Sequence, residues 1–179
     1  IGHEISHGFD DQGSKSDGDG NLRNWFTAAD LKAFQDRTDK LAAHYEAYTP
    51  IDDQHINGRL TLGENIGDLS GLAVAYRAYR LSLGTAPAPV IDAFTGDQRF
   101  FLGWAQVWRT KIRDDALRQQ LLTNPHSPGS YRAFVPLTNL QAFYDACFTA
   151  LRPGGVFVVN FIADEPRFGA YLARIERAF

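Results

Sequence analysis

The first eleven residues, IGHEISHGFDD, constrain this chain more than any other stretch of its sequence. His3 and His7 are four residues apart, and Glu4 directly follows the first histidine. In an α-helix, residues i and i+4 lie on one face, so two imidazoles with this spacing can converge on one metal ion. Glu4 is then placed to reach a water molecule on that ion rather than the ion itself. The alternative is a solvated helical face that carries two histidines by chance.

A second i, i+4 pair lies in the stretch GENIGDLSG, where Glu64 and Asp68 share a helical face. Two histidines leave a catalytic zinc one protein ligand short, and we predict that Glu64 is the third. Asp68 is expected to accept the outer N–H of a ligand histidine and so fix its tautomer. An alternative for Glu64 is a capping box with Thr61. That alternative leaves Asp68 unexplained, because two acids at this spacing repel unless a cation lies between them.

The chemistry of such a site suggests two further residues. Zinc lowers the pKa of its bound water to about 7, and we expect Glu4 to take the proton and return it to the leaving amine. A carbonyl attacked by that water becomes an oxyanion that needs donors. His126 and Arg132, in NPHSPGSYR, are candidates, one for the oxyanion and one for a substrate carbonyl. The alternative is an ordinary turn histidine and a surface arginine.

The hydrophobic spacing predicts a mainly helical chain. We expect helices over residues 1–9, 27–46 and 61–83, a largely buried helix over 100–112, and a shorter one over 114–122. From about residue 139 the pattern changes to a helix, a strand over 156–161 and a final helix. The sequence therefore predicts a mainly α domain over residues 1–140, followed by a helix–strand–helix tail over 141–179.

Composition excludes several classes of partner and fold. The net charge of −3 argues against a nucleic-acid partner, and no apolar run approaches the ~20 residues of a membrane span. The single cysteine, Cys147, excludes an internal disulfide. Because the first residue is Ile and no signal-peptide pattern precedes the histidines, we expect that the N-terminus is truncated.

Four stretches, in this order, resemble the C-terminal catalytic domain of the neprilysin-type zinc metallopeptidases: GHEISHGFDDQG, LTLGENIGDLSGL, FFLGWAQVWR and NPHSPGSYR. The resemblance covers residues 1 to about 146 and implies a zincin-like fold. It implies that His3, His7 and Glu64 bind Zn²⁺ and that Glu4 is the general base. It also implies that Asp68 supports the ligands, that His126 stabilises the transition state and that Arg132 holds a substrate carbonyl.

The resemblance further implies cleavage of oligopeptides, often before a hydrophobic residue, inside a closed chamber. Bacterial members of this group are commonly exported, which favours a periplasmic, extracellular or membrane-anchored location; the sequence itself assigns neither a compartment nor an oligomeric state. Family members are several times longer, with an upstream Asn-Ala-aromatic segment and a helical domain that roofs the cleft.

The tail, CFTALRPGGVFVVNFIADEPRFGAYLARIERAF, resembles instead a late segment of a spermidine-synthase-like or methyltransferase-like Rossmann domain. No early glycine-rich strand–turn–helix accompanies it, so we infer no transferase activity. The leading hypothesis is thus a zinc-dependent endopeptidase whose isolated chain has weak or no turnover. The alternatives are a catalytically silent zinc-binding remnant fused to the tail segment, a Rossmann-type transferase, and a plain helical scaffold.

Overall fold

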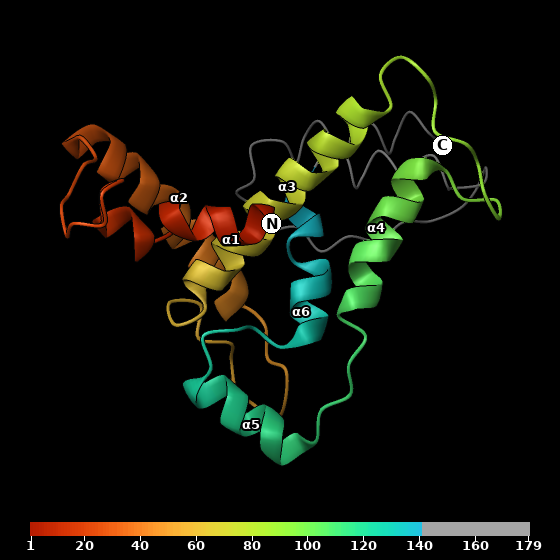
Figure 1. Ribbon diagram of the computed structural model, residues 1–179. Helices are drawn as coiled ribbons and strands as arrows, with labels where there is room; N and C mark the ends of the chain where they lie inside the picture. Colours follow the sequence, from red (N-terminus) through yellow and green to blue (C-terminus); the bar gives the residue numbers. More distant parts are fainter. Residues whose placement is uncertain (141–179) are drawn as a thin grey trace, which may run out of the picture.

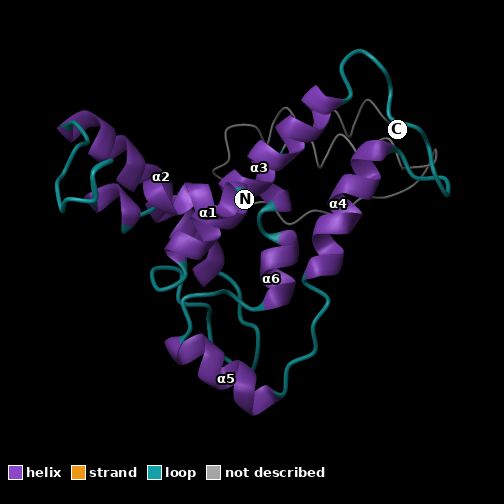
Figure 2. Ribbon diagram, in the orientation of Figure 1, coloured by secondary structure: helices purple, strands orange, loops and turns teal. Residues whose placement is uncertain are grey.

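The computed structural model describes residues 1–140 of the 179-residue chain, and this part is built from helices. Figure 1 shows their arrangement, and Figure 2 shows helices joined by loops without a strand among the described residues. Three isolated β-bridges are the sheet-like pairings of this part of the chain. The helices and 3-10 turns run as follows: α1 Gly2–Ser6, η1 His7–Phe9, η2 Gly13–Lys15, α2 Ala28–Glu46, α3 Leu62–Ser82, α4 Gly96–Val107, α5 Asp114–Thr123, α6 Gly129–Phe134 and η3 Leu137–Asn139.

Local signals explain where the long helices begin and end. The Thr27 hydroxyl accepts a hydrogen bond from the Asp30 amide at the start of α2, which is the contact of an N-cap residue. Gly84, just beyond α3, has φ +58°, a left-handed conformation that glycine adopts without steric cost. The helices expected over 27–46 and 61–83 are therefore found within one or two residues of their predicted ends.

The helix expected over 100–112 differs from its prediction in two respects. It begins earlier, at Gly96, because Thr95 and Gln98 form a capping box, and it ends at Val107. It is also not largely buried: Phe101 faces the core, whereas Leu102 and Val107 are 44% and 68% exposed. The strand and final helix predicted for the tail lie outside the described residues.

Two apolar clusters form the core of the described residues. One joins α2, α5 and the segment after α6 through Tyr45, Ile56, Leu121 and Val135. The other joins α3, α4 and η3 through Leu72, Phe101 and Leu137. The short helix α1 packs on α3, and α6 lies beside α4 (Figure 1). The first half of α3 is therefore the part of the fold against which the predicted site residues are gathered.

Candidate metal centre

Two glycines of α3 allow α1 to lie unusually close to it. A Cβ on Gly67 would lie 2.8 Å from Cε1 of His3, and a Cβ on Gly71 would lie 2.6 Å from the backbone nitrogen of His3. A larger residue at Gly71 would require the helices to separate, because it meets backbone, and one at Gly67 would displace the His3 ring. The GENIGDLSGL stretch thus forms a surface of α3 on which the histidine helix sits directly.

Three predicted ligands meet at this contact. The Nε2 atoms of His3 and His7 are 3.1 Å apart. Oε2 of Glu64 lies 3.2 Å from Nε2 of His3, and its Oε1 lies 3.7 Å from Nε2 of His7. One ligand atom from each residue lies within 4.8 Å of the others. Ligands about 2.0–2.1 Å from a tetrahedral zinc are about 3.3 Å apart, so the spacing fits a single ion of that size.

The outer nitrogens of both imidazoles face carboxylates. Nδ1 of His3 lies 3.0 Å from Oδ1 of Asp68, and Nδ1 of His7 lies 2.8 Å from Oδ2 of Asp10. In neutral rings these contacts place the proton on Nδ1, so both Nε2 lone pairs point at the same small space beside Glu64. Lone pairs and a carboxylate repel one another unless a cation lies among them. The donor set of this site therefore fits a bound metal ion.

Asp10 is a site residue that the sequence analysis missed. Its Oδ1 accepts hydrogen bonds from the backbone N–H groups of Gln12 and Gly13, which fixes the carboxylate in the turn after η1. The hydrogen bond with Asp10 raises the pKa of His7, with smaller contributions from Glu64 and Glu4, while burial opposes the rise. The available sequence signal was the position of Asp10, three residues after His7.

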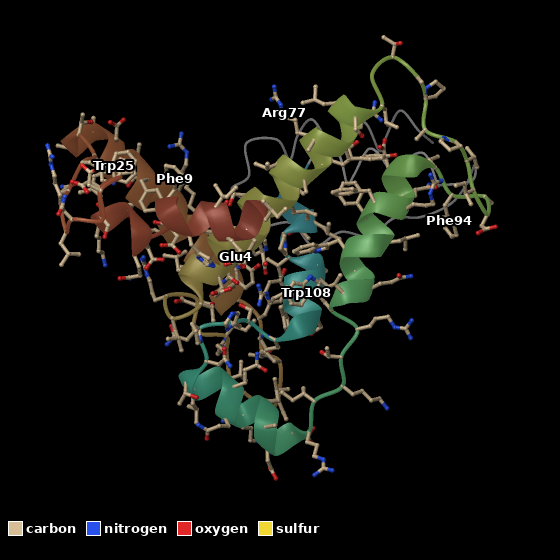
Figure 3. All side chains as sticks on the ribbon, viewed as in Figure 1. Glu4, Phe9, Trp25, Arg77, Phe94 and Trp108 are labelled. Carbon is tan, nitrogen blue, oxygen red and sulfur yellow. The ribbon has the colours of Figure 1, made fainter. Side chains whose placement is uncertain are left out.

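Arg132 lies between the two acids of α3. Its Nε and Nη2 donate to the two oxygens of Asp68 at 2.7 and 2.8 Å, and Nη2 lies 3.5 Å from Oε2 of Glu64. The guanidinium lies 4.2 Å from the centre of the Trp108 ring, which is labelled in Figure 3. Arg132 and Asp68 are both buried. The alternative interpretation of Arg132 as an ordinary surface arginine is therefore wrong. Its guanidinium supplies a cation beside the two carboxylates.

His126 and Glu4 complete the predicted set. Nε2 of His126 lies 3.1 Å from Oε2 of Glu64, although the two residues are far apart in the sequence. The Asn124 side-chain oxygen accepts a bond from the His126 amide and lies 2.9 Å from its Nδ1. Glu4 is exposed on α1, between the two histidines in sequence (Figure 3).

The capping-box alternative for Glu64 is wrong. Thr61 makes no side-chain cap at the start of α3; its hydroxyl donates to the backbone oxygen of Asn57 and accepts from the side chain of Asn65. Glu64 is therefore free of the helix start and reaches the histidines and His126 instead.

Comparison with known proteins identifies the family of this chain. The sequence model of peptidase family M13 matches residues 1–152. The chain belongs to peptidase family M13. Its relatives include an endothelin-converting enzyme homolog of Locusta migratoria, 43% identical over 147 residues, which cover 80% of this chain and 20% of that protein. Neprilysin-11 of Caenorhabditis elegans is 43% identical over 150 residues, which cover 81% of this chain and 18% of that protein.

Solved structures agree with this M13 assignment. The zinc metalloprotease Zmp1 of Mycobacterium tuberculosis, in complex with an inhibitor, superposes with TM-score 0.80 at 48% identity. The aligned region is 88% of this chain and 26% of the Zmp1 chain. PepO of Lactobacillus rhamnosis gives TM-score 0.71 at 34% identity, covering 88% of this chain and 23% of its own. The mainly α, zincin-like fold class is thus confirmed, and zinc is the metal that the family implies.

The similarity covers only part of each M13 relative. This chain spans about a fifth of the length of the curated relatives named above. The family match reaches residue 152, and nothing in the comparisons supports the predicted likeness of the tail to a methyltransferase segment. Within residues 1–140, no helix is both long and apolar enough to cross a lipid bilayer.

Proposed function

We propose that this chain carries the catalytic centre of a zinc-dependent M13 endopeptidase that hydrolyses oligopeptides. The observation that carries the proposal is the convergence of His3, His7 and Glu64, with both outer imidazole nitrogens on carboxylates. These three residues would hold the ion. When bound there, zinc supplies Lewis acidity that activates water and polarises a peptide carbonyl.

The chain's own residues would carry the remaining steps. Glu4, exposed on the histidine helix, takes a proton from the attacking water and gives it to the leaving amine. His126 lies beside Glu64 and donates a hydrogen bond to the oxygen that becomes negative in the transition state. Asp68 and Asp10 orient the imidazoles. Arg132, held by Asp68, is the candidate donor to a substrate carbonyl.

We expect weak turnover from this chain by itself. The helix α1 that presents His3 and Glu4 is five residues long, has no side-chain cap and buries none of its residues. A helix this short is marginal by itself, so the position of the general base depends on how α1 packs against α3. The alternative is a zinc-binding chain without turnover. By the family resemblance, we propose an exported location for the intact protein.

Metal analysis of the purified full chain tests the proposal. We expect one zinc per chain for the wild type and for Glu4→Gln, and a marked loss for Glu64→Ala. A fluorogenic peptide assay then separates the two functions. Turnover that a chelator and Glu4→Gln both abolish supports the peptidase, whereas zinc binding without turnover leaves the silent binder. Full metal content in Glu64→Ala would refute the ligand assignment.

A further inference from the structure

Three side chains in the first two turns of α3 contact three side chains of the segment that follows α5. The contacts follow the same order along the helix and along that segment. Each contact joins residues more than sixty positions apart in the sequence. The pairs are Glu64 with His126, Asn65 with Ser127, and Asp68 with Arg132. The first and third pairs belong to the proposed catalytic centre, whereas the middle pair has no role in it.

The middle pair is the most deeply buried of the three. The Ser127 hydroxyl donates to Oδ1 of Asn65 at 2.9 Å, and the two residues are 1% and 0% exposed. The His126 side chain beside it is 43% exposed, so water competes for its contact with Glu64. A neutral hydrogen bond that water cannot reach is costly to break, because both groups would remain unpaired. The Ser127–Asn65 bond is therefore the firmer of these two attachments.

The orientation of the Asn65 amide is fixed from its other side. The Thr61 hydroxyl donates its proton to the backbone oxygen of Asn57 at 3.0 Å, so toward Asn65 it can only accept. Nδ2 of Asn65 accordingly donates to Thr61 at 2.9 Å. The amide oxygen is left facing Ser127. This chain of donors ties the turn before α6 to the first turn of α3, the turn that carries Glu64.

We propose that Ser127 and Asn65 are positioning residues that hold the turn of residues 124–128 on α3, and so keep His126 facing Glu64. The inference rests on the proposed function for the role of His126. The hydrogen bonds of His126, apart from its contact with Glu64, do not reach α3. Asn124 lies in the same turn, and Gln120, which donates to the backbone oxygen of His126 at 3.1 Å, belongs to α5.

The test compares Ser127→Ala with Ser130→Ala in the full 179-residue chain. Ser130 is exposed and lies three residues further on, so its substitution controls for the loss of a hydroxyl in this region. Hydrogen exchange of the metal-free proteins is followed by NMR. In Ser127→Ala we expect the amides of His126 and Ser127 to exchange about tenfold faster or more, while those of α2 keep their wild-type rates. In Ser130→Ala both sets should match the wild type.

Zinc content and peptide hydrolysis give the second readout. Ser127→Ala keeps all three proposed ligands, so it should bind one zinc per chain. Its kcat should fall about tenfold with little change in KM, because a mobile His126 weakens transition-state stabilisation and not substrate binding. Unchanged exchange at His126, or an equal increase in α2, would overturn the positioning role. A wild-type chain that neither binds zinc nor cleaves peptide would refute the proposed function instead, and the exchange comparison would still decide this inference.

Discussion

The chemistry of this chain is concentrated where two imidazole nitrogens, 3.1 Å apart, face the same carboxylate. Each ring is turned by a carboxylate on its other side, Asp68 for His3 and Asp10 for His7. Because these acids set the tautomers, they determine which lone pairs are offered to a metal. Their substitution should therefore change metal affinity without removing a ligand.

Asp10→Asn tests this at the residue missed by sequence reasoning. The amide makes a weaker contact with His7, so the ring is a poorer base and is less firmly oriented. Zinc affinity, measured by competition with a chromophoric chelator, should fall about 10–100-fold. Asp11→Asn is the matched control, since Asp11 is the next acid in the chain and its Oδ2 accepts a hydrogen bond from the side chain of Gln12 rather than from a histidine. Equal affinities for the two variants would contradict the role of Asp10.

Arg132→Met tests the buried ion pair. The substitution leaves Asp68, which is 1% exposed, without its bidentate partner in a nearly dry environment. Breaking a buried pair in this way should lower the free energy of unfolding by about 3–5 kcal/mol. Urea unfolding of the metal-free protein measures the loss. Arg118→Met, which removes an arginine from an exposed ion pair, should have a far smaller effect. Similar losses for the two variants would show that the Asp68–Arg132 pair contributes no more to the free energy of unfolding than an exposed pair does.

At the scale of the helices, the fit of α1 on α3 depends on glycines. The backbone of His3 lies where a Cβ of residue 71 would be, and backbone cannot swing aside as a side chain can. The histidine helix is therefore held by shape as well as by metal and hydrogen bonds.

Gly71→Ala should separate α1 from α3 and abolish tight zinc binding while the rest of the chain stays helical. Isothermal titration with zinc and circular dichroism measure the two effects. Gly103→Ala is the control: a Cβ there meets nothing within 4 Å, and alanine favours the helix by about 0.5–1 kcal/mol. Unchanged zinc affinity in Gly71→Ala would contradict the packing argument.

The helix α2 carries a buried histidine that makes stability depend on pH. Burial lowers the pKa of His44, whose Nε2 lies 3.3 Å from the Tyr48 hydroxyl. The folded state then binds fewer protons than the unfolded state, whose histidine titrates near 6.5, so this contribution is present above about pH 6.5 and is lost as pH falls below it.

His44→Leu removes that proton linkage. Between about pH 7 and pH 5, the free energy of unfolding from urea titrations should fall less steeply for the variant than for the wild type. His55→Leu, which changes an exposed histidine, is the matched control. An identical slope for His44→Leu and wild type would contradict the assignment.

Considered as a whole, the molecule shows which features a sequence encodes locally. The pairs His3/His7 and Glu64/Asp68 were predictable because the helical period alone puts each pair on one face. The role of Asp10 was not, because its direction depends on backbone N–H groups in an irregular turn. The Ser127–Asn65 contact joins residues 62 positions apart and leaves no periodic signal. The earlier start of α4 was readable, since the Thr95 and Gln98 capping box is a local pattern.

The metal should stabilise the whole described fold, because its three proposed ligands come from α1, η1 and α3. At a free zinc concentration 100 times the dissociation constant, the gain in the free energy of unfolding is about 2.7 kcal/mol. Calorimetry with and without chelator should show a higher melting temperature for the zinc-loaded wild type and none of this shift for Glu64→Ala. A melting temperature that ignores zinc would instead favour the plain helical scaffold.

The contacts between α3 and residues 126–132 affect how the metal centre can move. The side chains of the proposed centre lie on α3 or on segments that contact it, namely α1, η1 and residues 126–132. Their spacings therefore depend on how these segments pack on one helix. A displacement of α3 would carry these segments with it and leave the spacings within the centre unchanged. The metal centre would therefore move as one rigid unit, and only access to it would change.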